Sequence, residues 1–265
     1  MAREAGKSPI SPKAVRQAGQ DSELDPPQFA AGDIADPADG TLHKDVIEAG
    51  NGLKVLIPAW PTAPYTPPGE KDSVTILWGR GPNPSDYVAV DSLTLTGPGT
   101  EYVFPLELTV PAANLRPDGL YQLKYRVELF NGSRNESVPV QIVTDNTPPW
   151  GNSNPAALQL PPGPITDEYL EAHPEGVVAT VPQYPGAQQP GDVVLVWWLK
   201  DIPDDPGNEP PAAIAPVADP QLVTIPAAHI RKTGSGDCYV IYILVDKAAN
   251  ASRISLYAKV KVELG

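Results

Sequence analysis

Apolar side chains alternate with polar or smaller ones in many short stretches of the chain. A period of two places alternate side chains on one face of a β-strand, so these stretches predict strands. Turn signals such as Pro117-Asp-Gly119, Asn131-Gly132 and Gly234-Ser-Gly236 separate them. The alternating apolar positions in the clearest stretches are Val74, Ile76 and Trp78; Tyr121, Leu123, Tyr125 and Val127; Val138, Val140 and Ile142; and Leu256, Ala258, Val260 and Val262.

Helical patterns are rare in this sequence. Only Asp167–Ala172 and a similar segment near Asp45–Ala49 have the composition of a short helix, one or two turns long. The pattern as a whole therefore predicts an all-β chain.

An internal repeat organises the chain. Four blocks of the first half recur in the same order in the second half, at a spacing of about 120 residues. The paired blocks start at Leu42 and Ile165, at Leu53 and Val177, at Asp72 and Asp192, and at Val110 and Ile225, and the last pair continues by matching Tyr121 with Tyr239. Because the blocks are collinear, we interpret the chain as two copies of one domain.

The repeat sets the expected domain boundaries. We predict a flexible or docking N-terminal arm over residues 1–25, a first domain over 26–146 and a second over 147–265. Pro148 and Pro149 follow directly after the last apolar alternation of the first copy, and paired prolines favour an extended, semi-rigid hinge.

Each copy has about seven short strands, a Trp in an early strand and a Tyr in a late hairpin. This combination is typical of an immunoglobulin-like β-sandwich. The fold class that we predict is therefore all-β: two tandem immunoglobulin-like β-sandwich domains with an irregular N-terminal arm.

Composition agrees with this fold and narrows the partners. The chain has 34 Pro and 22 Gly, which suits turns and loops better than helices. Its net charge of −13, without a local cluster of Lys or Arg, disfavours nucleic acid and anionic membrane surfaces. The single cysteine, Cys238, forms no intrachain disulfide and is expected to be a small buried strand residue, with a reactive thiol as the alternative.

Nothing in the sequence predicts insertion into a membrane. No segment has the 18 or so apolar residues that a helical span needs, and the first ten residues lack the apolar core of a signal peptide. We therefore expect the protein at the cell surface or outside the cell by a route that reads no N-terminal signal, or within a larger particle.

The late hairpin of each copy resembles a known family. The run from Gly119 to Asp145, and Asp237–Ser252 in the second copy, resemble the closing hairpin of bacterial Ig-like repeats, which occur in tandem in large surface adhesins and related proteobacterial proteins. The second run is similar to the family's D-x-A-G-N-x-S turn, with Ala249 where Gly is usual. The resemblance covers about nine-tenths of the chain as a pattern, and it implies an extracellular, stalk-like or adhesive role.

Signatures of catalysis are lacking. The sequence has no Gly-rich phosphate loop followed by Lys-Ser/Thr, no Gly-x-Ser-x-Gly turn and no Cys/His spacing for zinc. The three histidines, His43, His173 and His229, stand at non-equivalent positions of the repeat or replace another polar residue. We therefore predict that the protein is not an enzyme and needs no cofactor.

Calcium is the one metal that the sequence leaves open. Asp145 and Asn146 lie at the hinge and Asp246 lies near a loop, where tandem sandwiches sometimes bind an ion through hard oxygen ligands. The same residue types also form ordinary turns.

Four aromatic residues are candidate contacts for a protein or glycan. Trp197 and Trp198 are adjacent in a strand, so one belongs to the core while the other is exposed or covered by a loop. Trp60 and Tyr184 share a position before a proline, where an aromatic ring either closes the core or offers a platform to a ligand. The proline-rich segment 201–220 is either a covering loop or a recognition surface.

Three functions remain as hypotheses. The first is a non-enzymatic binding or spacer module of a bacterial surface, secreted or multi-protein assembly, which acts through protein–protein or adhesive contacts. The second is a carbohydrate-binding module that uses exposed aromatics. The third is a structural component of a phage tail or contractile particle, in which the N-terminal arm docks during assembly.

Overall fold

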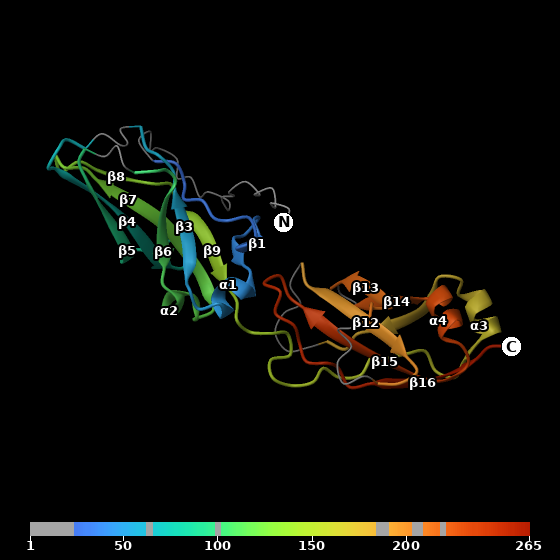
Figure 1. The fold of residues 1–265 in the computed structure, drawn as a ribbon. Coiled ribbons are helices and arrows are strands. Elements are labelled where there is room, and N and C mark those ends of the chain that lie inside the picture. Colours follow the sequence, from blue (N-terminus) through green and yellow to red (C-terminus); the bar gives the residue numbers. More distant parts are fainter. Residues whose placement is uncertain (1–23, 62–65, 99–101, 184–190, 203–208, 218–220) are drawn as a thin grey trace. The chain divides into compact units, whose positions relative to one another are not determined.

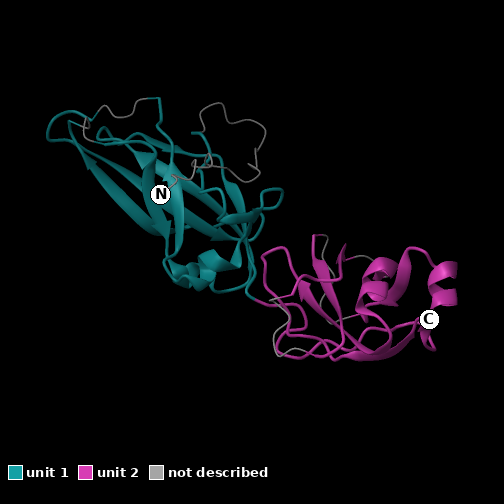
Figure 2. Ribbon diagram, turned by 45° about the vertical axis from the view of Figure 1, so that its right-hand side comes forward, with its two compact units in different colours: residues 1–146 teal, residues 147–265 magenta. Residues whose placement is uncertain are grey.

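The computed structural model describes residues 24–61, 66–98, 102–183, 191–202, 209–217 and 221–265. The chain divides into two compact units, Met1–Asn146 and Thr147–Gly265 (Figure 2). Each unit has its own buried apolar cluster, and its strands pair only within the unit. The all-β fold class predicted from alternation is confirmed.

The larger sheet of unit 1 is built around three long strands. Lys71–Arg80 (β4) pairs with Val88–Thr96 (β5) on one side and with Gly119–Glu128 (β7) on the other, all antiparallel. The sheet order is β1-β2-β9-β7-β4-β5, and β8 also pairs with β7. The short strands are Ile34–Asp36 (β1), Thr41–Leu42 (β2), Arg134–Glu136 (β8) and Val140–Thr144 (β9).

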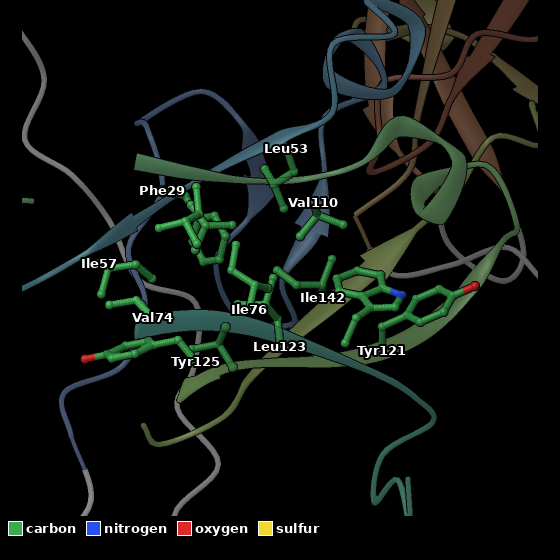
Figure 3. Packing of buried hydrophobic residues seen from close by; sticks show 14 of the residues in the cluster. Phe29, Leu53, Ile57, Val74, Ile76, Val110, Tyr121, Leu123, Tyr125 and Ile142 are labelled. Carbon is green, nitrogen blue, oxygen red and sulfur yellow. The ribbon is translucent and has the colours of Figure 1, made fainter. Parts of the chain in front are cut away.

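A second, two-stranded sheet closes the sandwich of unit 1. Leu53–Ile57 (β3) and Leu106–Val110 (β6) pair antiparallel. Figure 3 shows their side chains facing those of β4 and β7, with Leu53, Val110, Ile76 and Leu123 between the two layers. The inward residues are those that alternation marks as apolar, so burial of this face drives the packing of the two sheets.

Unit 2 repeats this plan with fewer strands (Figure 1). Its larger sheet has the order β10-β16-β15-β12-β13, and its smaller sheet pairs β11 with β14. The strands are Ile165–Thr166 (β10), Gly176–Thr180 (β11), Val193–Leu199 (β12), Ala213–Pro216 (β13), Leu222–Pro226 (β14), Gly236–Val245 (β15) and Ala258–Glu263 (β16).

Two short helices lie where the sequence predicts them and two do not. Lys44–Glu48 (α1) and Asp167–Ala172 (α3) are the predicted pair. Ala112–Leu115 (α2) and Ala227–Thr233 (α4) were not predicted; each follows a proline at the N-cap in the repeated Pro-Ala-Ala motif. Proline is tolerated at a helix start and alanine favours the helix, so the signal was present in the sequence.

The strand register defines which positions of the two units correspond. Trp78 pairs with Leu123 across β4 and β7, and Trp198 pairs with Val240 across β12 and β15. Both tryptophans are buried in the core of their unit. Leu123 therefore corresponds to Val240.

This register corrects the sequence alignment by one residue. It places Cys238, and not Tyr239, at the position of Tyr121. A shift of one residue moves a side chain to the other face of a strand, so Tyr239 points away from the core while Cys238 is fully buried. The prediction that Cys238 is a small buried strand residue is confirmed.

A shared hydrogen bond supports the corrected register. In unit 1 the backbone N–H of Tyr125 donates to Oγ of Ser137 at 3.0 Å. In unit 2 the backbone N–H of Tyr242 donates to Oγ of Ser255 at 2.9 Å. The register makes Tyr125 and Tyr242 equivalent. In each unit a serine hydroxyl accepts from the buried backbone N–H of this tyrosine.

One edge of each larger sheet, β5 in unit 1 and β13 in unit 2, is blunted. On β5 the N–H of Thr96 donates to Oη of Tyr102 and the N–H of Ser92 donates to Oδ1 of Asp91, both at 2.8 Å. On β13 the last residue is Pro216, which has no N–H to offer. Edge strands protected in this way resist pairing with another chain.

Candidate interaction surface

The solvent side of the larger sheet in unit 2 is apolar. Alternate residues of β12 and β15 point into the core, so the residues between them point outward. Those outward residues are Val193, Leu195, Trp197 and Leu199 of β12 and Tyr239, Ile241, Ile243 and Val245 of β15. The face continues to Ile214 of β13, which pairs with Leu195, and to Tyr257, whose ring meets that of Tyr239. We call these ten residues the apolar outer face.

The corresponding side of unit 1 is largely polar. At the eight positions equivalent to those of β12 and β15, unit 1 carries Ser73, Thr75, Leu77 and Gly79 on β4 and Gln122, Lys124, Arg126 and Glu128 on β7. Leu77 is the only large apolar side chain among them. Two copies of one sandwich therefore share a core pattern and differ on this outward side.

Ion pairs cover the polar side of unit 1. The carboxylate of Glu136 on β8 accepts from Lys124 Nζ at 2.5 Å and from Arg126 Nε at 2.8 Å. Partial burial acts to raise the pKa of Glu136, but these two charged donors outweigh it and hold the pKa below its usual value. The ammonium of Lys124 also lies 4.2 Å from the ring centre of Tyr87. The charged groups of Lys124, Arg126 and Glu136 are thus paired within unit 1.

Exposure varies across the apolar outer face. Ile214 is 64% exposed and Tyr257 is 54% exposed, whereas Trp197 is 4% and Ile241 is 1% exposed. The indole N–H of Trp197 donates to the backbone O of Glu209 at 2.8 Å, so the segment before β13 lies over this ring. The accessible part of the face thus lies on both sides of a covered centre.

Charged residues with balanced signs border this face on β15 and β16. Lys259 pairs with Asp237 at 2.7 Å and Lys261 pairs with Glu263 at 2.5 Å. The hydrogen bond from Lys259 lowers the pKa of Asp237, and the bond to Asp237 raises the pKa of Lys259. Two acidic and two basic side chains leave this border neutral in a chain with a net charge of −13.

The structure buries three of the four aromatic candidates. Trp198 and Trp60 belong to the cores of their units and are 1% and 5% exposed, and Trp60 meets Phe104 edge to face at 5.3 Å. Trp197 is covered as described. None of these three rings has the open face that stacking on a ligand needs, because strand pairing and covering loops enclose them. Tyr184 lies outside the described residues.

Two of the residues proposed for calcium make hydrogen bonds within their own units. The amide Nδ2 of Asn146 donates to Oδ1 of Asp118 at 2.8 Å and to the O of Arg116 at 3.0 Å. Asp246 accepts from the N–H and Nδ2 of Asn250, at 2.8 and 2.9 Å. Asp145 follows β9 in unit 1, whereas Asp246 lies in unit 2. In the part of the chain that the structure describes, no group of three or more His, Cys, Asp or Glu is placed to hold a metal ion.

The three histidines have local contacts. His43 caps α1 by accepting from the N–H of Asp45 at 3.2 Å, and His173 stacks on Tyr169 with ring centres 4.3 Å apart. Nε2 of His229 lies 3.4 Å from the backbone O of Trp198. These contacts hold the rings in turns and helix ends.

A small hollow adjoins the covered centre of the apolar outer face. It has a volume of about 240 Å³ and its walls include Trp197, Lys200, Glu209 and His229. Nζ of Lys200 is committed to the backbone O of Gly234 and of Ser235, at 2.8 and 2.6 Å. The ammonium of Lys200 thus already has two backbone acceptors.

The proline-rich segment and the N-terminal arm were also singled out in the sequence. Part of the segment 201–220 forms the edge strand β13, which alternation did not reveal because prolines surround it. Residues 203–208 and 218–220, and residues 1–23 of the arm, lie outside the described residues. From Leu24 onward the chain joins unit 1, where Leu24 bridges Ser137. No helix among the described residues is long and apolar enough to cross a membrane.

Comparison with known proteins gives structural likeness only. No family model and no curated protein matches the chain. Similar solved structures include the FN1–FN3 domains of chicken CNTN1, with 10% identity over 94% of this chain and 70% of that chain and a TM-score of 0.42. Fibronectin(III)-like modules of Clostridium thermocellum CbhA share 17% identity over 81% of this chain and 87% of that chain, with a TM-score of 0.36.

A bacterial ice-binding adhesin is also similar, with 12% identity over 83% of this chain and 60% of that chain and a TM-score of 0.34. The fold class itself rests on the strand pairing and burial described above.

Proposed function

We propose that the protein is a non-enzymatic binding and spacer module of a bacterial surface, secreted or multi-protein assembly. In this proposal unit 2 makes the protein–protein contact through the apolar outer face, and unit 1 serves as the scaffold or spacer. The observation that carries it is the difference between equivalent sides of the two units, polar in unit 1 and apolar in unit 2.

Physical chemistry favours a contact at this face. Exposed apolar side chains cost solvation free energy and, where they gather, commonly mark a protein interface; on this face Ile214 and Tyr257 are 64% and 54% exposed. Unit 1 shows that the same scaffold accepts polar residues at these positions, so the fold does not require the apolar ones. The blunted edges of β5 and β13 disfavour strand addition at those two edges.

The carbohydrate-binding alternative gains less support. A glycan platform needs an accessible aromatic ring, and Trp197, Trp198 and Trp60 are 4%, 1% and 5% exposed. The exposed aromatic of the face, Tyr257, sits against Tyr239 and beside apolar neighbours, as suits a protein contact.

Site-specific photo-crosslinking in the cell that makes the protein tests the proposal. A photoreactive residue is placed at Ile214 of β13 and, in a matched control, at Val88 of β5; both side chains are 64% exposed on edge strands. We expect adducts with protein from position 214 and few from position 88. Equal labelling from both positions, or none from either, would contradict the assigned role of the face.

A further inference from the structure

The smaller sheets of the two units correspond residue by residue. Each begins at a glycine of positive φ, Gly52 at +81° and Gly176 at +128°. A Cβ on Gly52 would lie 2.3 Å from the backbone O of Val110, and a Cβ on Gly176 would lie 2.0 Å from that of Ile225. These two close approaches make Val110 of β6 equivalent to Ile225 of β14, in agreement with the register of both sheets.

Two residues of β14 direct their backbone groups away from β11. Thr180 of β11 exchanges backbone hydrogen bonds of 2.9 and 3.0 Å with Gln159, on the side opposite β14. Bonding direction alternates along an antiparallel pair, so Leu222, which lies across from Thr180, does not bond to β11, and neither does Thr224 two residues on. The N–H and C=O groups of Leu222 and Thr224 therefore point to the outer edge of β14, where both residues are exposed.

In unit 1 a carboxylate occupies the corresponding edge. Oδ2 of Asp91 on β5 accepts from the backbone N–H of Thr109 on β6 at 2.8 Å. Thr109 is the equivalent of Thr224, and the register of β13 on β12 places Ala213 where unit 1 has Asp91. Alanine offers no acceptor, and in the described part of unit 2 no other group accepts from the N–H of Thr224.

The outward side of the smaller sheet differs in the same sense. In unit 1 Lys54 of β3 and Glu107 of β6 form an ion pair at 2.9 Å. The equivalent positions of unit 2 hold Val178 and Leu222, which are 43% and 48% exposed. Unit 2 is thus uncharged where unit 1 carries an edge carboxylate and an ion pair, and it exposes two apolar side chains there.

We propose that this edge binds an extended, uncharged segment of another protein, which adds to β14 as a third strand of the smaller sheet. The outward groups of Leu222 and Thr224 select an extended backbone, because such a backbone exchanges hydrogen bonds with both residues at once. Val178 and Leu222 select apolar side chains on the outward side of that segment. The site lies on the smaller sheet, so the inference goes beyond the proposed function and does not depend on the apolar outer face.

The charge of the chain favours such a segment over a second copy. β14 has no charged residue from Leu222 to Pro226, so an uncharged segment meets no repulsion there. A second copy would bring a whole chain of net charge −13, and two such chains repel each other. Pro226 has no N–H and ends the pairing, so the contact is short and we expect a dissociation constant of about 0.1–1 mM.

Binding of a defined peptide to the full-length chain tests the proposal. The probe is a short, end-blocked peptide of alternating threonine and valine, N-methylated at its threonines. In the extended form its valine N–H groups lie along one edge, and the methyl groups block the other edge. Pairing opposite Leu222 and Thr224 puts the valine side chains on the outward side of the sheet. The matched control peptide is N-methylated at its valines instead and cannot donate to β14.

Nuclear magnetic resonance of the nitrogen-15-labelled chain locates the binding. We expect the first peptide to shift the backbone amide signals of Leu222 and Thr224. The signals of their equivalents in unit 1, Glu107 and Thr109, should stay in place, because Asp91 occupies that edge. The control peptide should shift none of these signals.

Two variants give unit 2 the features that protect unit 1. Ala213→Asp supplies the missing carboxylate and should weaken peptide binding at least about tenfold, because the new side chain accepts from the N–H of Thr224. Val88→Asp adds the same charge to the edge strand β5 and should bind as wild type does. Val178→Lys combined with Leu222→Glu rebuilds the ion pair and should also weaken binding. Circular dichroism verifies that each variant is folded.

The outcomes separate this inference from the proposed function. No shift at Leu222 and Thr224 up to about 2 mM peptide, equal binding of both peptides, or unaltered binding by Ala213→Asp refutes the strand site. A chain that dimerises in sedimentation velocity, with a dimer abolished by Ala213→Asp, would make a second copy the occupant and overturn the choice of another protein. Crosslinks from position 214 report on the larger sheet, so they decide the proposed function independently.

Discussion

Ala249 has a backbone φ of +71°, in the left-handed region that residues with a Cβ seldom adopt. The turn is held by hydrogen bonds from Asp246 N to Asn250 O and from Ala249 N to Asp246 O, both at 3.0 Å. In unit 1 the same two bonds link Leu129 with Ser133 and Gly132 with Leu129, and Gly132 has φ +82°. The two turns are equivalent, and one of them uses alanine where the conformation favours glycine.

We therefore expect Ala249→Gly to stabilise the protein by about 1 kcal/mol, which is the left-handed cost of alanine less the added flexibility of glycine when unfolded. Gly132→Ala should destabilise it by a similar amount, since nothing lies within 4 Å of the added Cβ and only backbone strain acts. Urea unfolding monitored by circular dichroism measures both changes. A midpoint that falls for Ala249→Gly would show that the turn needs its methyl group.

Tyr125 connects a single hydroxyl to stability at high pH. Burial, and secondarily the charge of Asp25, raise the pKa of Tyr125 far above its ordinary value of 10.0. At a pH between the unfolded and folded pKa values, only the folded chain keeps the proton of this hydroxyl. Its contribution to the free energy of unfolding is therefore fully present below pH 10 and is lost as the pH rises above that value. We expect Tyr125→Phe to flatten this fall in urea titrations above pH 10. An alkaline slope identical to that of wild type would contradict the assignment.

At the scale of the elements, sequence patterns revealed strands well where one side is polar. In β4 and β7 the outward residues include Ser73, Thr75, Lys124 and Arg126, so the period of two is plain and the core residues follow from it. The prediction that β7 alternates from Tyr121 to Val127 is confirmed by their burial.

The same reasoning failed where both sides are apolar. In β12 and β15 the outward residues are apolar as well, so no period of two marks which residues face the core. This is why Tyr239 was aligned with Tyr121, one residue away from its true equivalent, Cys238. It is also why the sequence did not reveal the apolar outer face, which appears only once the register is known. The last strand, β16, also begins later than predicted: Leu256 lies before it and is 59% exposed.

Asp72 ties three elements together from a buried position. Its Oδ2 accepts from Oγ1 of Thr66 at 2.6 Å and its Oδ1 accepts from the N–H of Phe130 at 2.7 Å, while its own backbone belongs to β4. The equivalent position of unit 2 also holds an aspartate, Asp192, and both side chains are 3% exposed.

Asp72→Ala removes the acceptor for two donors, one of them a backbone N–H. Hydrogen bonds to a charged group contribute about 1.5–3 kcal/mol each, and they are not fully additive, so we expect a loss of about 3 kcal/mol. Asp72→Asn keeps one carbonyl oxygen and should cost less. Chemical unfolding of both variants measures the difference; equal losses would show that shape, and not hydrogen bonding, fixes this position.

At the scale of the molecule we propose that residues 26–146 and 147–265 fold as separate domains, with Pro148 and Pro149 at the start of the second. Two apolar clusters without strand pairing between the units support this division. If it holds, Asp72→Ala should lower the melting temperature of one calorimetric transition and leave a second one in place. Asp192→Ala should do the reverse. A single transition that moves as a whole in both variants would mean that the units unfold together.

The difference between the equivalent outer sides of the two sandwiches has a consequence for protein engineering. Eight alternate residues on two neighbouring strands differ between the copies, while the inward residues keep the same apolar pattern. Under the proposed function, recognition is thereby separated from folding, because one set of alternate positions stabilises the sandwich and the other set makes the contact. We therefore expect the surface to be portable: if the proposed function holds, transplanting the outward residues of β12 and β15 onto β4 and β7 should give unit 1 the same contact without altering its core.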